Sequence, residues 1–548
     1  MRASQTPRPP DSVLPNCLPL VTKQGGFWSL KPNALLPALV DYRASMRAMP
    51  FGTVIGNAKI ILPHVLFSML YQHHHTEWLR RVATGGIAKI KAFWESQRNH
   101  PSYASHPMHG HKFAFKSKAV PLAIHADGVA VTGVGKKSQK HMDAFSWTSL
   151  LAMGLPANVN SFLIALLFQI LERSDGLTAR QLWTVMSWSF HWLYQGVWPE
   201  YDWTGRQYSQ DDGIAYIRRG QPLAGGFFGV VWVMRADLDY VNNSFKLGAR
   251  GEKCHLCQCN QDTIPYTDCR HDACWKATIW SGAGHAAAFD KRHIALRSIP
   301  GVSITSFTPD ILHAKHLGVD MAYVGAVLQI LLDTINPGNE NDSLSSLWAE
   351  IQASYKARKT VNRLNVLTKT MIKGYSKTYP ALSARGLQIR DLIPTVKDVW
   401  VKTMDQSNQT HRIITRGLEA TWAMEEVLTR CKDAFALPLE EANLFVGECH
   451  TYLGCLTAGI KAYHPRRAYF NYTIKTHILL HLAECAKYCN PMFGSCYDGE
   501  IMMAVVRRLI QGTARGSKPL TVANAALERY VHAKSFEVTH PHERFIHR

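Results

Sequence analysis

The sequence predicts a mixed α/β protein in which a small sheet is followed by a long helical region. Apolar runs of strand type, such as "AVPLAIHAD" and "GGFFGVVWVM", lie between residues 119 and 235. Helical spacing of apolar residues dominates after about residue 320. With 548 residues, of which 46% are hydrophobic, the chain can bury a large core and form two to four folded regions.

The N-terminal region is expected to be a disordered tail followed by a few helices, together spanning residues 1–105. Residues 1 to about 30 are rich in proline and polar side chains, which is typical of a loose tail. Three segments between residues 34 and 98 then show helical spacing: "LLPALVDYRASM", "ILPHVLFSMLY" and "EWLRRVATGGIAKIKAFWESQ".

Residues 106–253 are expected to form the sheet. The runs "AVPLAIHAD" and "GVAVTGVG" predict two strands with a turn at Gly128, and "AFSWTSLLAMG" predicts a third. The helical stretch "TARQLWTVMSWSFHWLYQGV" precedes a further strand, "GGFFGVVWVM". Three strands, a helix and a strand form the opening order of an RNase H-like sheet, an order that unrelated α/β folds share.

The rest of the chain is expected to be mainly helical, with residues 254–484 and 485–548 as its two parts. Segments such as "SSLWAEIQASYKARKTVNRLNVLTKTMIKGYSK" and "EIMMAVVRRLIQGTARGSK" carry this pattern. The longest uncharged stretch, residues 144–171, contains Gly154 and Pro156, so we expect two buried elements rather than a membrane span. The start of the sequence has no apolar core of signal-peptide length, and secretion is not expected.

The charge balance predicts a polyanionic partner. The formal net charge is +20, and nucleic acid is the commonest partner of such a protein, although membrane surfaces bind it too. Residues 351–390 contain no Asp or Glu, which favours contact with a phosphate backbone over a solvated helix face. The candidate DNA-binding residues there are Lys356, Arg358, Lys359, Arg363, Lys369 and Lys373.

Three acids stand at the ends of predicted elements. Asp127 and Asp237 each end an apolar strand, and Glu500 heads a helix just after Asp498. Carboxylates that converge in this way can hold two Mg²⁺ or Mn²⁺ ions for phosphoryl transfer. Taken singly, each Asp is more simply explained as a turn or helix-cap residue, and Asp239 competes with Asp237 for the second position.

A cysteine cluster between residues 254 and 274 holds five of the 12 cysteines. A C-x-x-C pair followed about a dozen residues later by a second Cys/His group matches structural zinc spacing. The candidate zinc ligands are Cys254, Cys257, Cys269, His271 and Cys274. The composition of the second group stays open, since Cys259 is also near, and buried or free thiols are the alternative.

The segment "TPDILHAKHLGVD" places Asp310 and His313 on one face of a helix start, with His316 one turn later. By itself this spacing decides nothing, because a histidine on an apolar helix is more often a core residue than a ligand. Taken in order, however, "HADG", "VVWVMRADLDY", the C-x-x-C pair, "PDILHAKHLGVDMAYVGAVLQILL" and "YDGEIMMAVVRRLIQGTARGSKPL" resemble the transposases of CACTA-type (En/Spm) DNA transposons. The resemblance covers about residues 100 to 530.

This resemblance implies a DDE site formed by Asp127, Asp237 and Glu500 in an RNase H-like core, which a zinc-containing helical insertion interrupts. Asp310 and His313 match the Asp-x-x-His of that insertion. The implied activity is metal-dependent cleavage and strand transfer at transposon ends, with Arg507 and Arg508 close enough to neutralise phosphates.

The partners implied are double-stranded DNA and further copies of the chain on DNA, in the nucleus, with no membrane and no small-molecule substrate. Two alternatives remain open. One is a catalytically inactive, domesticated DNA-binding zinc protein, and the other is an RNase H-like nuclease that acts on RNA.

Overall fold

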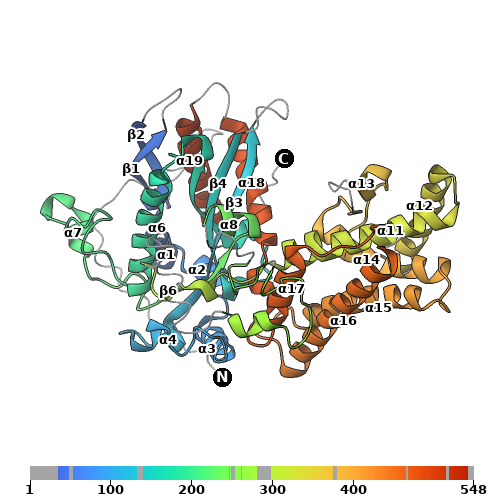
Figure 1. Ribbon diagram of the computed structural model, residues 1–548. Helices are drawn as coiled ribbons and strands as arrows, with labels where there is room; N and C mark the ends of the chain where they lie inside the picture. Colours follow the sequence, from blue (N-terminus) through green and yellow to red (C-terminus); the bar gives the residue numbers. More distant parts are fainter. Residues whose placement is uncertain are drawn as a thin grey trace.

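The computed structural model describes residues 35–47, 53–132, 140–245, 247, 254–260, 262–279, 296, 298–373, 379–464, 467–513 and 518–540. They form a mixed α/β protein in which a helical part projects from a part that contains the sheet (Figure 1). Each part has its own hydrophobic core. The predicted α/β class, with a mixed sheet and a helical C-terminal region, is confirmed.

The central sheet has four strands in the order β5-β4-β3-β6 among the described residues. The middle strand β3 (Ala119–Thr132) pairs antiparallel with β4 (Lys140–Ser149) and parallel with β6 (Phe228–Arg235). The edge strand β5 (Ser161–Phe168) pairs antiparallel with β4. Helix α6 (Leu177–Gln195) follows β5 in the chain and packs on β6, which lies at the opposite edge of the sheet. All residues of β5 and β6 are buried, as expected of strands that are apolar throughout.

The expected turn at Gly128 is wrong. The runs on either side of it form the single strand β3, in which Asp127 lies opposite Ala144 and Gly128 opposite Asp143. An Asp-Gly pair makes a hairpin turn when its flanking strands pair with each other. Here both flanks pair with β4 instead, so the ladder continues through the pair. Residues 133–135 of the second run lie outside the described residues.

The helix expected from "LLPALVDYRASM" is also wrong. Strand β1 (Leu39–Arg47) occupies this segment and pairs antiparallel with β2 (Thr53–Ile61). Tyr42, Ala44 and Met46 are buried and the residues between them are not, so the relevant period is two rather than 3.6. The other two segments are helical, as predicted: they form α1 (Pro63–His73), α2 (His75–Arg81) and α3 (Gly86–Ser96). The predicted tail lies outside the described residues.

The helical part begins with a π-helical segment, η9 (Leu312–Asp320), which continues directly into α11 (Met321–Ile335). The helices that follow are α12 (Glu340–Arg358), α13 (Lys369–Lys373), α14 (Gly386–Thr403), α15 (Gln409–Arg430), α16 (Leu439–Tyr463) and α17 (Ile474–Cys485). The continuous helix expected after residue 345 is interrupted, because Lys359 adopts a left-handed conformation (φ 53°) that ends α12.

After the helical part, the chain returns to the sheet. Helix α18 (Tyr497–Thr513) packs on β3, and α19 (Pro519–Thr539) packs on β5 and β2. The hydroxyl of Tyr530 in α19 donates to the carbonyl of Ser161 and accepts from the amide of Leu163.

Short elements complete the description of the fold. They are η1 (Leu36–Ala38), η2 (Pro107–Gly110), α4 (Phe115–Lys118), η4 (Leu150–Ala152), α5 (Ala157–Asn160), η5 (Gln169–Leu171), η6 (Gln210–Asp212), α7 (Ile214–Arg218), α8 (Leu238–Asn243), η7 (Cys274–Thr278), η8 (Ile304–Ser306) and η10 (Pro491–Gly494).

One stretch within the described residues, Leu312–Ile335, is long and apolar enough to cross a membrane. The protein itself buries 72% of the most apolar window of this stretch, which is the behaviour of a core helix in a soluble protein. The uncharged stretch at residues 144–171 holds two buried strands, β4 and β5, as predicted.

Candidate functional site

The predicted acids come from three neighbouring elements. Asp127 lies in β3, Asp237 lies two residues after the end of β6, and Glu500 is in the first turn of α18, which packs on β3. Strands β3 and β6 are parallel, and His125 lies opposite Arg235. Asp127 and Asp237 each lie two residues after this pair, so they occupy equivalent positions just beyond the last paired residues of β3 and β6. We call these three residues the acid cluster.

The members of the acid cluster lie close enough for their charges to change the ionisation of Asp127 and Glu500. Burial raises the pKa of Asp127 to about 7, and the negative charges of Asp237 and Glu500 add to this effect. Burial also raises the pKa of Glu500, with a further contribution from Asp237. The oxygens do not all lie within 4.8 Å of one another, as ligands of a single ion would. Two ions about 3.5–4 Å apart can be shared by carboxylates with a wider spread.

Asp237 and Asp239 have different surroundings. A carboxylate oxygen of Asp237 accepts a 2.6 Å hydrogen bond from the amide of Tyr240 and caps α8, so the predicted capping role is correct. Asp239 is exposed and bonds to Asn243 within the same helix. Asp237 also acts on the pKa of Asp127, whereas Asp239 is not among the charges that do so. Of these two residues, Asp237 is therefore the one placed within electrostatic range of Asp127.

Asp310 and His313 lie beside the acid cluster. The carboxylate of Asp310 is buried and accepts a 2.5 Å hydrogen bond from Nδ1 of His313. The other nitrogen of His313, Nε2, is 3.8 Å from Oε1 of Glu500. Burial opposes the protonation of His313, yet Asp310, together with Asp237 and Glu500, raises its pKa. Asp310 also accepts from the amide of Cys496, which fixes the segment that leads into α18.

The start of α18 approaches the sheet at Gly499. A Cβ atom at this position would lie 2.0 Å from Nε2 of His125, so any larger residue would clash with that ring. His125 is buried between Gly499 and Arg235, and burial, together with the charge of Arg235, lowers its pKa to about 3. This contact brings Glu500 to the strand that carries Asp127.

A second group, which we call the Cys/His cluster, consists of Cys254, Cys257, Cys259 and His477. Their sulfur and nitrogen atoms all lie within 4.8 Å of one another, and all four residues are buried. Sγ of Cys257 is 3.2 Å from Nε2 of His477, and it is 3.3 Å from Nε2 of His481. Three thiols and an imidazole within this distance are a donor set that suits a tetrahedral metal site such as zinc.

Two of the five predicted zinc ligands belong to the Cys/His cluster. Cys254 and Cys257 belong to the Cys/His cluster, but Cys269, His271 and Cys274 do not. Cys274 is exposed, the thiol of Cys269 donates to a backbone carbonyl, and the ring of His271 lies 3.7 Å from that of His450. Their places are taken by Cys259 and by His477 of α17, which lies 220 residues after Cys257. The pattern "HILLH", with histidines four apart, is the signal that could have identified α17.

A third group contains His316, Asp320 and Glu425, all buried. The ammonium of Lys315 already lies among these acids, 2.9 Å from Asp320 and 2.6 Å from Glu425. It supplies the positive charge that a metal ion would otherwise provide. His316 bonds both to Glu425 and to the hydroxyl of Tyr497 at the start of α18, so this buried network connects the helical part with α18.

Some of the predicted DNA-binding residues already have an ion-pair or hydrogen-bond partner within the protein. Arg358 forms a two-point ion pair with Asp398 of α14, and Arg363 donates to the carbonyl of Thr360. Lys356 and Lys359 are exposed at the end of α12, and Lys369 begins α13, in the projecting helical part (Figure 1). Lys373 ends α13, and its side chain lies outside the description.

Two further predicted arginines, Arg507 and Arg508, are exposed on α18. Nε of Arg507 donates to the carbonyl of Ala130 in β3. The positive charge of Arg507 also moderates the pKa of Glu500, so this arginine lies within electrostatic range of the acid cluster.

No protein-family model matches the chain, and no curated protein matches it. The geometry itself defines a mixed α/β protein with a cluster of three partly exposed acids beside the parallel strands β3 and β6, and a Cys/His cluster that could bind a metal such as zinc.

Proposed function

We propose that the protein is a metal-dependent enzyme that cleaves and joins DNA, similar to the transposases of CACTA-type transposons. The acid cluster carries this proposal. Asp127 and Glu500 are 373 positions apart in the printed sequence, yet Glu500 and Asp237 both act on the pKa of Asp127. The sheet order, with three antiparallel strands followed by one parallel to the first, supports an RNase H-like core.

Asp127 and Asp237 are partly exposed and Glu500 is exposed, but three neighbouring carboxylates still repel one another, and a bound cation relieves this repulsion. Carboxylates are the ligands that Mg²⁺ and Mn²⁺ prefer. Asp127, Asp237 and Glu500 would hold such ions, which would activate the attacking water and stabilise the leaving oxygen. His313, whose pKa Asp310 raises against the effect of burial, lies beside this cluster with Nε2 3.8 Å from Oε1 of Glu500.

The charge of the protein supports DNA as the substrate. The net charge of +20 attracts a polyanion, while Arg507 places one positive charge near the acid cluster. Assembly of several copies on DNA and a nuclear location follow from such a substrate and are part of the proposal.

We assign a structural role to the Cys/His cluster. Its ligands come from the segment after β6 and from α17, so a zinc ion held by them would connect the sheet with the helical part. All four ligands are buried, which leaves the ion no open position for a substrate.

The central test is DNA cleavage with Mg²⁺ or Mn²⁺, on duplexes taken from the genomic DNA that flanks the coding region. We expect Asp127→Asn, Asp237→Asn and Glu500→Gln each to reduce cleavage at least about 1,000-fold, because each removes a ligand of the metal ions. Asp239→Asn is the matched control and should cleave at a rate close to that of the wild type.

Identical products from the wild type and Asp127→Asn would contradict catalysis by the acid cluster. Binding of DNA without cleavage by the wild type would favour a domesticated DNA-binding protein. Cleavage of RNA but not DNA would favour an RNase H-like ribonuclease.

Metal binding should also depend on pH. Because the pKa of Asp127 is raised to about 7, its carboxyl is protonated below pH 7 in the metal-free protein, and a bound cation must displace that proton. We expect the Mn²⁺ dissociation constant of zinc-loaded protein to rise up to about tenfold per pH unit below 7 and to level off above it. Titration calorimetry between about pH 6 and 8 measures this, and an affinity independent of pH would contradict it.

A further inference from the structure

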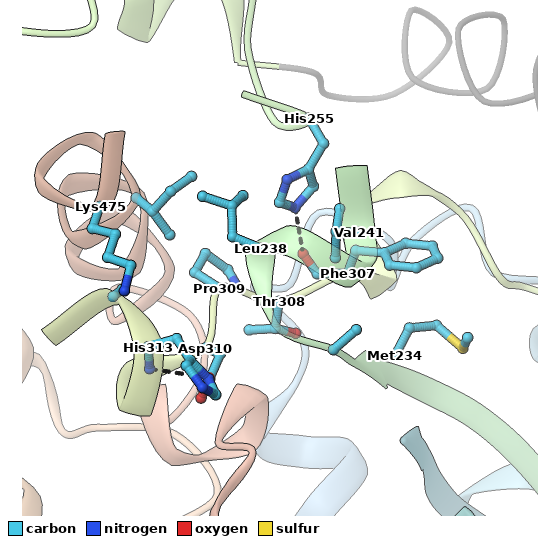
Figure 2. Close-up of a pocket in the computed structure, with 13 residues that line it drawn as sticks. Met234, Leu238, Val241, His255, Phe307, Thr308, Pro309, Asp310, His313 and Lys475 are labelled. Carbon is cyan, nitrogen blue, oxygen red and sulfur yellow. Dashed lines mark hydrogen bonds and ion pairs between the residues drawn. The ribbon is translucent and has the colours of Figure 1, made fainter. Parts of the chain in front are cut away.

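A lysine of α17 lies between the Cys/His cluster and the acid cluster. Lys475 precedes the cluster ligand His477 by two residues. Its side chain lines a partly open cavity of about 20 Å³, together with Asp310, His313 and His255. Figure 2 shows the side chain of Lys475 extending from α17 toward the segment that carries His313.

The π-helical segment η9 is shaped to receive this side chain. Leu317 and Gly318 have non-helical backbone angles, and the carbonyl of Leu317 accepts a 2.7 Å hydrogen bond from the Lys475 ammonium. A Cβ atom on Gly318 would lie 3.2 Å from Cδ of Lys475 and 2.6 Å from the carbonyl oxygen of His313. The kink and the missing side chain therefore give the lysine stem its place. A π-helical irregularity of this kind is frequent at functional sites.

The ammonium of Lys475 is held near the acids without being paired to them. Asp237 and Asp310 are close enough to act on it electrostatically. Among the residues that the structure describes, however, no carboxylate lies within the 4.0 Å of an ion pair, and the carbonyl of Leu317 is its one hydrogen-bond partner. An ammonium has three N–H donors, so two remain for an oxygen in the adjoining cavity.

We propose that Lys475 binds a phosphate oxygen of the DNA strand that enters the acid cluster. This inference rests on the proposed function and adds a substrate-binding residue to it. Lysine acts as a point charge toward phosphate, and a donor fixed by a carbonyl needs little reordering when the phosphate arrives. Because α17 also supplies His477, the Cys/His cluster sets the position of this phosphate contact.

The test compares Lys475→Gln with Lys461→Gln, a matched control on the exposed surface of α16. Binding of a fluorescent 30-base-pair duplex is measured by anisotropy in Ca²⁺ at several salt concentrations, and cleavage is measured in Mg²⁺. For Lys475→Gln we expect the slope of log K against log salt to decrease by about 0.9, and single-turnover cleavage to fall about 10- to 100-fold. Lys461→Gln should match the wild type in both measurements.

Zinc content and thermal unfolding show whether Lys475→Gln is folded. A second measurement needs no variant: mass spectrometry after acylation of lysines, with and without the duplex. DNA should protect Lys475 several-fold but leave Lys461 equally reactive.

Two results would overturn the inference. One is a folded Lys475→Gln variant with the salt slope and the cleavage rate of the wild type, and the other is a wild-type Lys475 that DNA does not protect from acylation. The role of Lys475 would then be limited to its hydrogen bond with the carbonyl of Leu317. If the wild type neither binds nor cleaves DNA, the proposed function fails and this inference fails with it. The wild-type measurement therefore distinguishes the two failures.

Discussion

Replacing Cys257 with serine is expected to abolish stoichiometric zinc binding and to destabilise the helical part of the protein. Cys257 is central to the Cys/His cluster, since its sulfur contacts both His477 and His481. The cluster joins segments 220 residues apart, and a structural zinc site contributes on the order of 10 kcal/mol of binding free energy. Loss of the ion should therefore remove a large share of the stability that holds α17 against the residue 254–259 segment.

Zinc content by atomic emission and thermal unfolding measure this effect. Cys274→Ser is the matched control, because Cys274 belongs to the same cysteine-rich stretch but is exposed and lies outside the Cys/His cluster. It should retain one zinc ion per chain and the wild-type melting temperature. Retention of one zinc ion by Cys257→Ser would contradict the assignment, and loss of zinc from Cys274→Ser would restore the original choice of ligands.

The variant Lys315→Met is expected to lower the free energy of unfolding by about 3–5 kcal/mol. The ammonium of Lys315 is completely buried and lies between the carboxylates of Asp320 and Glu425. A methionine fills much of the same volume but leaves the two carboxylates buried without their partner. Denaturant unfolding measures the loss.

Two further variants test the physical reason. Lys356→Met changes an exposed lysine on α12 and should alter stability by less than about 0.5 kcal/mol. Adding Glu425→Gln to Lys315→Met removes one of the two buried carboxylate charges that lack a positive partner. The double variant should therefore recover part of the lost free energy of unfolding. If Lys315→Met were as stable as Lys356→Met, the buried network would not be an important source of stability.

Elements with a strong local pattern could be predicted from the sequence, whereas those defined by tertiary pairing could not. The strand β6 and the helix α6 are where their apolar patterns place them. The segment Leu39–Arg47 was misassigned because its apolar residues fit both periods, and its pairing with β2 decides between them. The Asp127–Gly128 pair looks like a turn until β4 is known to run past it.

The candidate sites follow the same rule. The order of the acids along the chain predicted Asp127, Asp237 and Glu500, and the structure brings charges of Asp237 and Glu500 within range of Asp127. The Cys254–Cys257 pair is local and was found, while its histidine partner comes from α17. Because residues 351–390 contain no acidic residue, the ion pair of Arg358 could not be predicted from that stretch. Its partner, Asp398, lies further along the chain.

The packing of α19 has a consequence for how the protein is made. Asn524 accepts a hydrogen bond from the amide of Lys59 in β2, and Ser535 accepts one from Leu35, 500 positions earlier. Contacts of α19 with β2 and Leu35 therefore span 465 and 500 positions of the chain, and pairings over such separations form slowly. Glu500 in turn reaches Asp127 only once α18 has packed on β3, so the acid cluster is assembled after β3 itself has been translated.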